Sequence, residues 1–216
     1  HVRPVVADGS HPSTGKLYRN DGVGTKGHPV FKDVSKEAGI TYDGLGLGLV
    51  ISDFNKDGYP DIYCSDDFTS SDILYLNDGE GHFSNVIKQA TAHTSMYGMG
   101  VDAADLNNDG FPDLMQLDML PKENDRLKMM LGGQDYDRKQ MSISPQFGHQ
   151  MQYMRNSLQM NLGIGQRAEG RGQKGTNVPL FSEVGLMAGV AQTDWSWATL
   201  LADFDNDGRK DIYVTN

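Results

Sequence analysis

The amino-acid sequence predicts an all-β fold built from repeated four-stranded antiparallel sheets, and three observations support this. A nine-residue acidic loop occurs three times, as "DFNKDGYPD" (53–61), "DLNNDGFPD" (105–113) and "DFDNDGRKD" (203–211). Each loop lies between two short apolar runs. The 216 residues also include 26 glycines, and frequent tight turns favour short strands. A repeat of about 50 residues with this content is typical of a β-propeller blade.

The strands of one unit follow a fixed order. Buried first strands are predicted in the small and apolar runs before the loops, "GLGLVISD" (46–53), "GMGVDAAD" (98–105) and "WATLLADF" (197–204). Second strands follow the loops as "DIYCSD", "DLMQLD" and "DIYVTN". Third strands end at an Asn followed two residues later by Gly, as in "LYRNDG", "LYLNDG" and "LQMNLG", and fourth strands begin near Phe31, Phe83 or Phe181. Asn-Asp-Gly accepts positive φ at both central positions, so we expect type I′ hairpin turns there.

This order divides the chain into a half blade (1–45), a blade (46–97), a second blade (98–196) and a half blade (197–216). Propellers close with roughly four to eight blades. This chain contains about three blades' worth of sequence, so we predict that it is part of a larger propeller. The remainder of that propeller chain is then an expected partner. A compact two-sheet β domain is the alternative. An insertion (118–157) interrupts the period and contains "PKENDRLKMMLGG", which predicts a short helix near 121–131.

Composition excludes several classes of protein. The formal net charge of −10 argues against nucleic-acid binding, which needs a basic face. No apolar run of 18 residues occurs, so direct membrane insertion is not expected. The single cysteine, Cys64, rules out an internal disulfide framework. The chain starts at His1 without a signal-peptide pattern, which favours a processed chain or an excerpt.

The acidic loops have the pattern of a calcium site. Positions 1, 3, 5 and 9 carry carboxylate or amide oxygens, Gly at position 6 permits a sharp turn, and the position 7 carbonyl faces the ion. Calcium takes six to eight such oxygens in flexible geometry. We therefore predict about three Ca²⁺ ions, with ligands from Asp53, Asn55, Asp57, Tyr59 and Asp61, from Asp105, Asn107, Asp109, Phe111 and Asp113, and from Asp203, Asp205, Asp207, Arg209 and Asp211.

Two other interpretations of the loops are weaker. An EF-hand needs Glu at position 12, where this chain has Cys64, Gln116 and Val214. Aspartates that only cap turns through their own backbone explain one or two per loop, but not ligands at four alternate positions. The ten loop aspartates account for much of the acidity, so the charge indicates a metal requirement.

The loops and their flanks resemble the FG-GAP/VCBS repeats of integrin-α-type β-propellers. The resemblance is closer to the bacterial proteins related to cartilage acidic protein, which often carry an ASPIC/UnbV domain. It rests on "FKDVSKEAGI", "LYLNDGEGHF", "DMLPKEND", "MRNSLQMN" and "TDWSWATLLADFDNDGRKDIYVTN", and it covers nearly the whole chain. It implies a calcium-binding propeller within a longer polypeptide, extracellular or on the outer-membrane surface of a bacterium. Asn at position 3 in two loops departs from the all-Asp version, which bears on affinity.

The leading functional hypothesis is a non-catalytic recognition module. Propellers hold variable loops rigidly on one face, and such loops commonly bind ligands. The loops opposite the acidic ones are predicted to bind a glycan or a protein at the cell surface through Asp66, Asp67, His93, Arg155, Asp194 and Trp195. In the alternative interpretation, Trp195 and Trp197 pack between blades and the aspartates cap turns.

Two further classes stay open. A hydrolase or lyase acting on polysaccharide would use a carboxylate pair on that face. However, the sequence has no G-x-S-x-G, no H-E-x-x-H and no Cys–His candidate. A pure assembly scaffold would instead dock proteins on the methionines at 119, 129, 130, 141, 151 and 154, because methionine side chains adapt to irregular surfaces.

Overall fold

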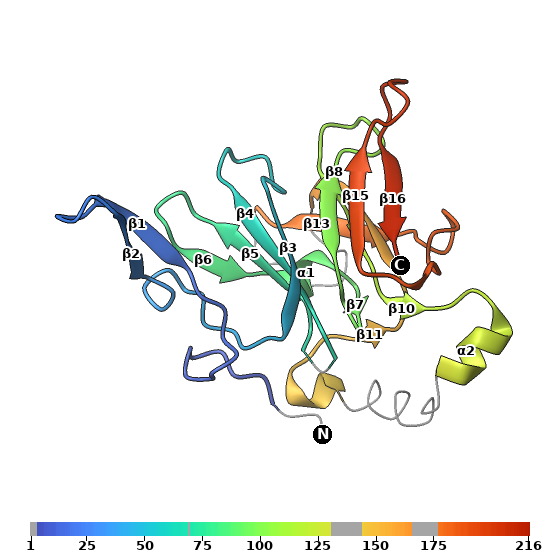
Figure 1. The fold of residues 1–216 in the computed structure, drawn as a ribbon, viewed down its shortest axis with the longest axis horizontal. Helices are drawn as coiled ribbons and strands as arrows, with labels where there is room; N and C mark the ends of the chain where they lie inside the picture. Colours follow the sequence, from blue (N-terminus) through green and yellow to red (C-terminus); the bar gives the residue numbers. More distant parts are fainter. Residues whose placement is uncertain (1–3, 69, 131–143, 166–176) are drawn as a thin grey trace.

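The computed structural model describes residues 4–68, 70–130, 144–165 and 177–216, and its secondary structure is mostly β. Two four-stranded antiparallel sheets form its centre (Figure 1). The first contains β3 (Gly46–Ser52), β4 (Asp61–Asp66), β5 (Ile73–Asn77) and β6 (Phe83–Asn85). The second contains β8 (Val101–Ala104), β9 (Asp113–Gln116), β12 (Ser157–Ile164) and β13 (Pro179–Glu183). In both, neighbouring strands follow chain order.

A two-stranded antiparallel sheet lies on each side of this centre. One contains β1 (Tyr18–Val23) and β2 (Pro29–Asp33), and the other contains β15 (Ala198–Ala202) and β16 (Asp211–Thr215). The prediction of repeated antiparallel sheets, including four-stranded ones, is confirmed. A closed ring of sheets is not seen in the described part of the chain.

Shorter elements connect the sheets at the end away from the acidic loops (Figure 1). There β7 (Thr94–Ser95) pairs in parallel with β11 (Gln152–Tyr153), and β10 (Met119–Leu120) pairs with β14 (Asp194–Trp195). Helix α2 (Asn124–Met130) lies inside the predicted helical segment, whose last residue is outside the described ranges, as are residues 132–143 of the insertion. The sequence did not predict α1 (Ile87–Ala90) or the 3₁₀ turn Ser144–Phe147. None of the described helices is long and apolar enough to cross a membrane.

The hydrophobic core lies between successive sheets. Phe54 of the first acidic loop and Tyr63 of β4 are buried in a cluster against which Val101 and Ala103 of the second sheet pack. The next interface repeats this arrangement, because Met115 of the second sheet and Leu201 of β15 share a cluster. Each sheet thus buries one face against its neighbour, as layered β structures require.

The hairpin turns differ from the predicted type I′. In the turn after β5, Gly79 has a φ of +80°, but neither Asn77 nor Asp78 has positive φ. Instead, the Asn77 Oδ1 accepts the Gly79 N–H at 3.0 Å. An Asn side chain that bonds the backbone two residues on forms an Asx turn, which explains the repeated Asn-x-Gly. The Tyr59 ring also requires glycine here, since a Cβ on Gly79 would lie 2.4 Å from it.

Candidate metal centre

The three acidic loops adopt the same backbone conformation. Position 4 is left-handed in each, with φ of +58° at Lys56, +59° at Asn108 and +61° at Asn206. Position 6 is left-handed as well, with φ of +92°, +91° and +88° at residues 58, 110 and 208. A Cβ at position 6 would meet nothing within 4 Å, so the φ value, not crowding, requires glycine there. Position 4 is Lys in the first loop and Asn in the other two, yet its φ value is nearly the same in all three. The loop conformation therefore does not depend on the residue at position 4.

Backbone N–H groups hold the carboxylates of positions 1 and 5 against the loop. In the first loop, Asp53 Oδ1 accepts the Asp57 N–H at 3.1 Å and its Oδ2 accepts the Gly58 N–H at 2.9 Å. Asp57 Oδ1 accepts the Tyr59 N–H at 2.9 Å. The second and third loops repeat all three bonds, at 2.8–3.1 Å. Turn capping is therefore part of what these aspartates do, and each carboxylate keeps lone pairs for a cation.

The position 9 aspartate connects the loop to the third strand. Asp61 is fully buried, and its two oxygens accept the N–H groups of Phe54 and Asn77, both at 2.9 Å. Asp113 is equally buried, and its bonds to Leu106 and Asn161 are 2.9 and 2.7 Å long. Position 9 thus fixes the loop relative to the sheet as well as facing the other carboxylates.

The electrostatics of the loops favour a bound cation. The pKa of Asp61 is raised to about 6, chiefly by burial and also by the nearby Asp57 and Asp53, against the lowering effect of its two N–H donors. Burial also raises the pKa of Asp113, with added repulsion from Asp109 and Asp105. A divalent cation among these oxygens would remove the repulsion and favour ionised carboxylates.

Position 3 distinguishes the third loop from the others. The Asn55 amide donates to Asp57 Oδ2 at 2.8 Å, and Asn107 donates to Asp109 at 2.9 Å. The third loop has a carboxylate there, and Asp203, Asp205 and Asp211 each offer an oxygen, all within 4.8 Å of one another. These hard oxygens in a small volume fit a divalent cation such as Ca²⁺.

We expect the third loop to bind Ca²⁺ most tightly, because it offers one more carboxylate than its neighbours. Asp205→Asn should lower its affinity on the order of tenfold, about 1.4 kcal/mol, to the level of the other loops. Asn55→Asp is the matched control and should strengthen the first loop. Calorimetric titration of the three proteins measures the affinities, and equal affinity at all three native loops would contradict the ranking.

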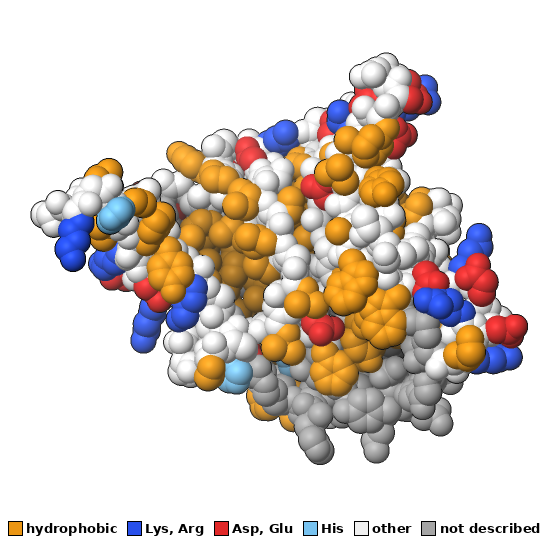
Figure 2. All heavy atoms as spheres, viewed as in Figure 1, with side chains coloured by type: hydrophobic (Ala, Val, Ile, Leu, Met, Phe, Trp, Pro, Cys, Tyr) orange, Lys and Arg blue, Asp and Glu red, His pale blue; other side chains and the backbone are white. Residues whose placement is uncertain are grey.

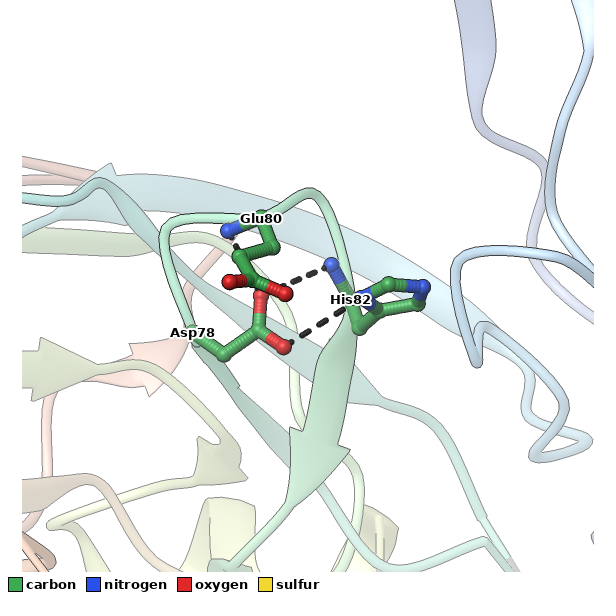
Figure 3. Close-up of side chains that lie close together, drawn as sticks. All are labelled: Asp78, Glu80 and His82. Atoms are coloured by element: carbon green, nitrogen blue, oxygen red, sulfur yellow. Dashed lines mark hydrogen bonds and ion pairs between the residues drawn. The ribbon is translucent and has the colours of Figure 1, made fainter.

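A second acidic group, not identified from the sequence, lies in the turn between β5 and β6 (Figure 3). Asp78, Glu80 and His82 each offer a ligand atom within 4.8 Å of the others, and all three are exposed. Asp78 accepts the N–H groups of Glu80 at 2.8 Å and His82 at 3.1 Å, and its other oxygen lies 3.3 Å from His82 Nδ1. The alternate spacing of these three residues in "DGEGH" is the sequence signal from which the group could have been identified.

The residues predicted for ligand binding lie at strand ends away from the acidic loops, and the structure brings two of them together. Arg155 Nη2 donates to Glu183 at 2.9 Å and lies 3.4 Å from His93 Nε2. Its guanidinium carbon is 5.0 Å from the centre of the Tyr153 ring. Burial and the positive charge of Arg155 lower the pKa of His93. Glu183, which joins this group, was not predicted, because it comes from a distant strand.

The other predicted ligand residues have different surroundings. Asp194 pairs with Arg126 of α2, and Trp195 is 40% exposed on β14. Asp67 is half-buried after β4. Asp66 is only 1% exposed, so it lies beneath the surface and lines an apolar cavity.

Comparisons with known proteins support the repeated unit that contains the acidic loops. Residues 53–115, which span the first two acidic loops, match the FG-GAP-like repeat family. A stretch of 82 residues is 32% identical to human integrin alpha-7. That match covers 33% of this chain and 7% of the integrin, so the chain spans a small part of the relative's length. Residues 53–115 are therefore an FG-GAP-like repeat, and the chain is distantly similar to an integrin α-chain.

Proposed function

We propose that this chain is a calcium-stabilised part of a β-propeller, related to the cartilage-acidic-protein-like proteins with ASPIC/UnbV domains. The observation that carries the proposal is the identical geometry of three acidic loops, each between the first and second strands of its sheet. The FG-GAP-like repeat supports it, since such repeats form the propellers of integrin α-chains. An extracellular or bacterial cell-surface location follows from that relationship.

In this proposal, Ca²⁺ is structural and supplies positive charge among the clustered carboxylates. The side chains of positions 1, 3, 5 and 9, with the position 7 carbonyl, would hold it. The N–H groups of the loop already orient these oxygens, as in Asp53 and Asp57, so binding costs little further ordering. The position 9 aspartate would transmit this stabilisation to the third strand through its bond to Asn77 or Asn161.

We further propose a non-catalytic role in recognising a protein or glycan on the side opposite the acidic loops. Trp195 supplies an exposed ring on a short strand that pairs with β10. Arg155 supplies a partly exposed guanidinium fixed by Glu183 and the Tyr153 ring. An exposed aromatic ring and an oriented guanidinium are groups that suit carbohydrate or acidic peptide ligands.

Trp195→Ala should reduce ligand capture at least tenfold and leave calcium stoichiometry unchanged. Loss of an aromatic anchor commonly costs more than about 1 kcal/mol of binding energy. The measurement is binding of the intact protein to glycan and peptide arrays, followed by titration with the best hit. Phe31→Ala is the matched control, because it removes an exposed ring on β2 that belongs neither to the acidic loops nor to the predicted ligand residues. Equal losses in both variants, or the loss of a calcium site in Trp195→Ala, would contradict the separation of the two faces.

A further inference from the structure

Four side chains from three separate segments meet near the paired strands β7 and β11, at the end of the molecule away from the acidic loops (Figure 1). His93 comes from the segment between α1 and β7. Tyr153 ends β11, and Arg155 follows it two residues later. Glu183 ends β13. None of the four belongs to an acidic loop, so this group is separate from the candidate calcium sites.

One carboxylate oxygen of Glu183 faces two nitrogen-bearing side chains. Glu183 Oε2 accepts an N–H of Arg155 Nη2 at 2.9 Å and lies 3.8 Å from His93 Nε2. Arg155 Nη2 is itself 3.4 Å from His93 Nε2. The guanidinium is always charged, whereas the imidazole is charged only when it is protonated. A proton on His93 therefore places a second cation against the same oxygen.

The surrounding contacts hold Glu183 and His93 more firmly than Arg155. Glu183 Oε1 accepts the Gly185 N–H at 2.6 Å, so both oxygens of this carboxylate are engaged. The His93 ring packs edge-on against the Tyr153 ring, with centroids 4.8 Å apart. The side chains of Glu183 and His93 are 9% and 12% exposed, whereas that of Arg155 is 21% exposed. Arg155 is therefore the member of the group that can turn toward solvent.

The charge state of His93 decides how strongly Glu183 holds Arg155. Burial and the positive charge of Arg155 lower the pKa of His93, against the raising effect of Glu183, so His93 is neutral at pH 7. The charges of Arg155 and Glu183 then cancel. Once His93 gains a proton, its Nε2–H donates to Glu183 and its charge repels Arg155. The group then carries one uncompensated positive charge.

Other charged side chains do not offset this change. Arg155 and Glu183 are the charged groups that act on His93. Strands β7, β11 and β12 contain no charged residue, and Glu183 is the only one on β13. Helix α1, which contacts β13, carries Lys88, but its ammonium donates to the Gly148 carbonyl. Among the described residues, the charge of this group thus depends on His93.

The chemistry of a released guanidinium selects a carboxylate. Its N–H donors form a planar fork that binds both oxygens of a carboxylate at once. Arg155 Nε is buried and has no hydrogen-bond partner among the described residues. The Arg155 guanidinium carbon lies 5.0 Å from the centre of the Tyr153 ring, so that face of the ring is not free to stack on a neutral sugar. These contacts favour an acidic ligand over a neutral glycan.

The surface beside Arg155 is apolar, which favours an acidic peptide over an acidic polysaccharide. Met151 and Tyr153 stand two residues apart on the segment that pairs with β7, and they are 38% and 37% exposed. Their backbone carbonyls accept the N–H groups of Thr94 and Met96 at 3.0 and 3.2 Å, which fixes this segment. Figure 2 shows further hydrophobic side chains over the end of the molecule where β7 and β10 lie. Methionine and aromatic side chains suit the apolar side chains of a peptide.

We propose that Arg155 binds a carboxylate of an acidic peptide, and that a proton on His93 makes Arg155 available by taking over Glu183. This inference rests on the proposed recognition role of this side of the molecule, and it adds the ligand class and a control by pH. Affinity should rise as the pH falls through the pKa of His93. Linkage is reciprocal, so a bound carboxylate should in turn favour the protonated form of His93.

Binding of a defined peptide at two pH values tests the proposal. The probe is a fluorescent peptide of alternating Asp and Leu residues, titrated with the intact protein in saturating Ca²⁺. At about 0.15 M salt, the charge of distant side chains is largely screened. The native protein should bind the peptide about tenfold more tightly at pH 5 than at pH 7.5.

Three variants and a matched control assign the effect. Glu183→Gln keeps an acceptor for Gly185 but removes the competing charge, so it should bind at pH 7.5 as tightly as the native protein does at pH 5. Misfolding cannot produce such a gain. His93→Gln should bind weakly at both pH values, and Arg155→Gln should not bind. His28→Gln, at an exposed site in the β1–β2 hairpin, should keep the native pH dependence.

Proton uptake is an independent readout of the linkage. The pKa of His93, followed by nuclear magnetic resonance, should be higher in the peptide complex than in the free protein. Calorimetry at pH 6 in two buffers with different ionisation enthalpies should show proton uptake on binding by the native protein. His93→Gln should show none.

Equal affinity of the native protein at both pH values, or no gain in Glu183→Gln, would overturn the inference. Binding of an oligogalacturonate but not of the peptide would overturn the peptide as the ligand. The Trp195→Ala measurement tests the broader recognition role separately. Capture that depends on Trp195 but not on pH overturns only the present inference. Peptide binding that depends on pH but not on Trp195 overturns only the role of Trp195.

Discussion

Removing calcium should lower the melting temperature of the chain on the order of 20 °C. A ligand that binds only the folded state stabilises it by about 2.7 kcal/mol per site at a hundredfold excess over Kd, so three loops would contribute about 8 kcal/mol. For a domain of this size, 1 kcal/mol corresponds to roughly 2–4 °C. Without the ions, the burial of Asp61 and Asp113 and the repulsion from their neighbouring carboxylates, which together raise the pKa of both groups, oppose folding. Differential scanning calorimetry with and without chelator measures the shift.

Two controls assign this effect to the acidic loops. Added back after chelation, Mg²⁺ should restore less stability than Ca²⁺, because it prefers rigid octahedral sites with retained waters. A triple variant with Asn in place of Asp53, Asp105 and Asp203 should melt at the same temperature with and without chelator. An unchanged melting curve for the native chain would refute structural calcium.

The strand order and the acidic loops could be predicted from the sequence because they depend on local, repeated signals. Gly58, Gly110 and Gly208 are required by backbone conformations that the loops themselves set. The four-strand order of both central sheets could also be predicted, because it follows the order of the repeated segments. The expected burial of the first strands is wrong for β3, whose residues are mostly exposed, since no described sheet covers their outer face. Repetition strengthened each of these signals.

Features that depend on distant parts of the chain could not be predicted. The partner of Arg155 is Glu183, which arrives from β13, and no spacing rule connects them. Asp66 was predicted on the ligand-binding side because it lies where the second strand ends, yet Gly44 packs so closely that a Cβ there would lie 2.5 Å from the Asp66 carboxylate. The turn after β5 and the Asn161–Gly163 segment within β12 form Asx turns in place of the predicted type I′ turns, because the Asn side chain accepts the Gly N–H.

Replacing Asp66 by Asn should stabilise the chain at high pH and flatten its dependence on pH. The pKa of Asp66 is raised from an ordinary value near 3.8 to about 8, chiefly by burial and also by the neighbouring carboxyls of Asp72 and Asp43. Its Oδ2 has no hydrogen-bond partner among the described residues. Between pH 4 and 8 the folded chain therefore holds a proton that the unfolded chain has released. Stability falls as the pH rises through this window.

The size of the effect follows from the shift in pKa. One pKa unit corresponds to about 1.4 kcal/mol, so ionising Asp66 costs the folded state several kcal/mol by pH 9. At pH 5, Asp66→Asn should be neutral or slightly destabilising, since the carboxyl is already uncharged and an amide adds an unpaired donor. By pH 9 the variant should melt at a higher temperature than the native chain. Melting curves in saturating Ca²⁺ at pH 5, 7 and 9 measure the difference.

Asp21→Asn is the matched control for the pH-dependent effect of Asp66→Asn on the melting temperature. Asp21 is exposed, and the Arg19 side chain lowers its pKa, so it is ionised in both the folded and unfolded chain throughout this range. Its substitution should shift the melting temperature by a small amount that does not change with pH. A constant difference between Asp66→Asn and the native chain from pH 5 to 9 would show that Asp66 is already ionised in the folded protein. In that case a cation or a donor must neutralise it within the cavity that it lines.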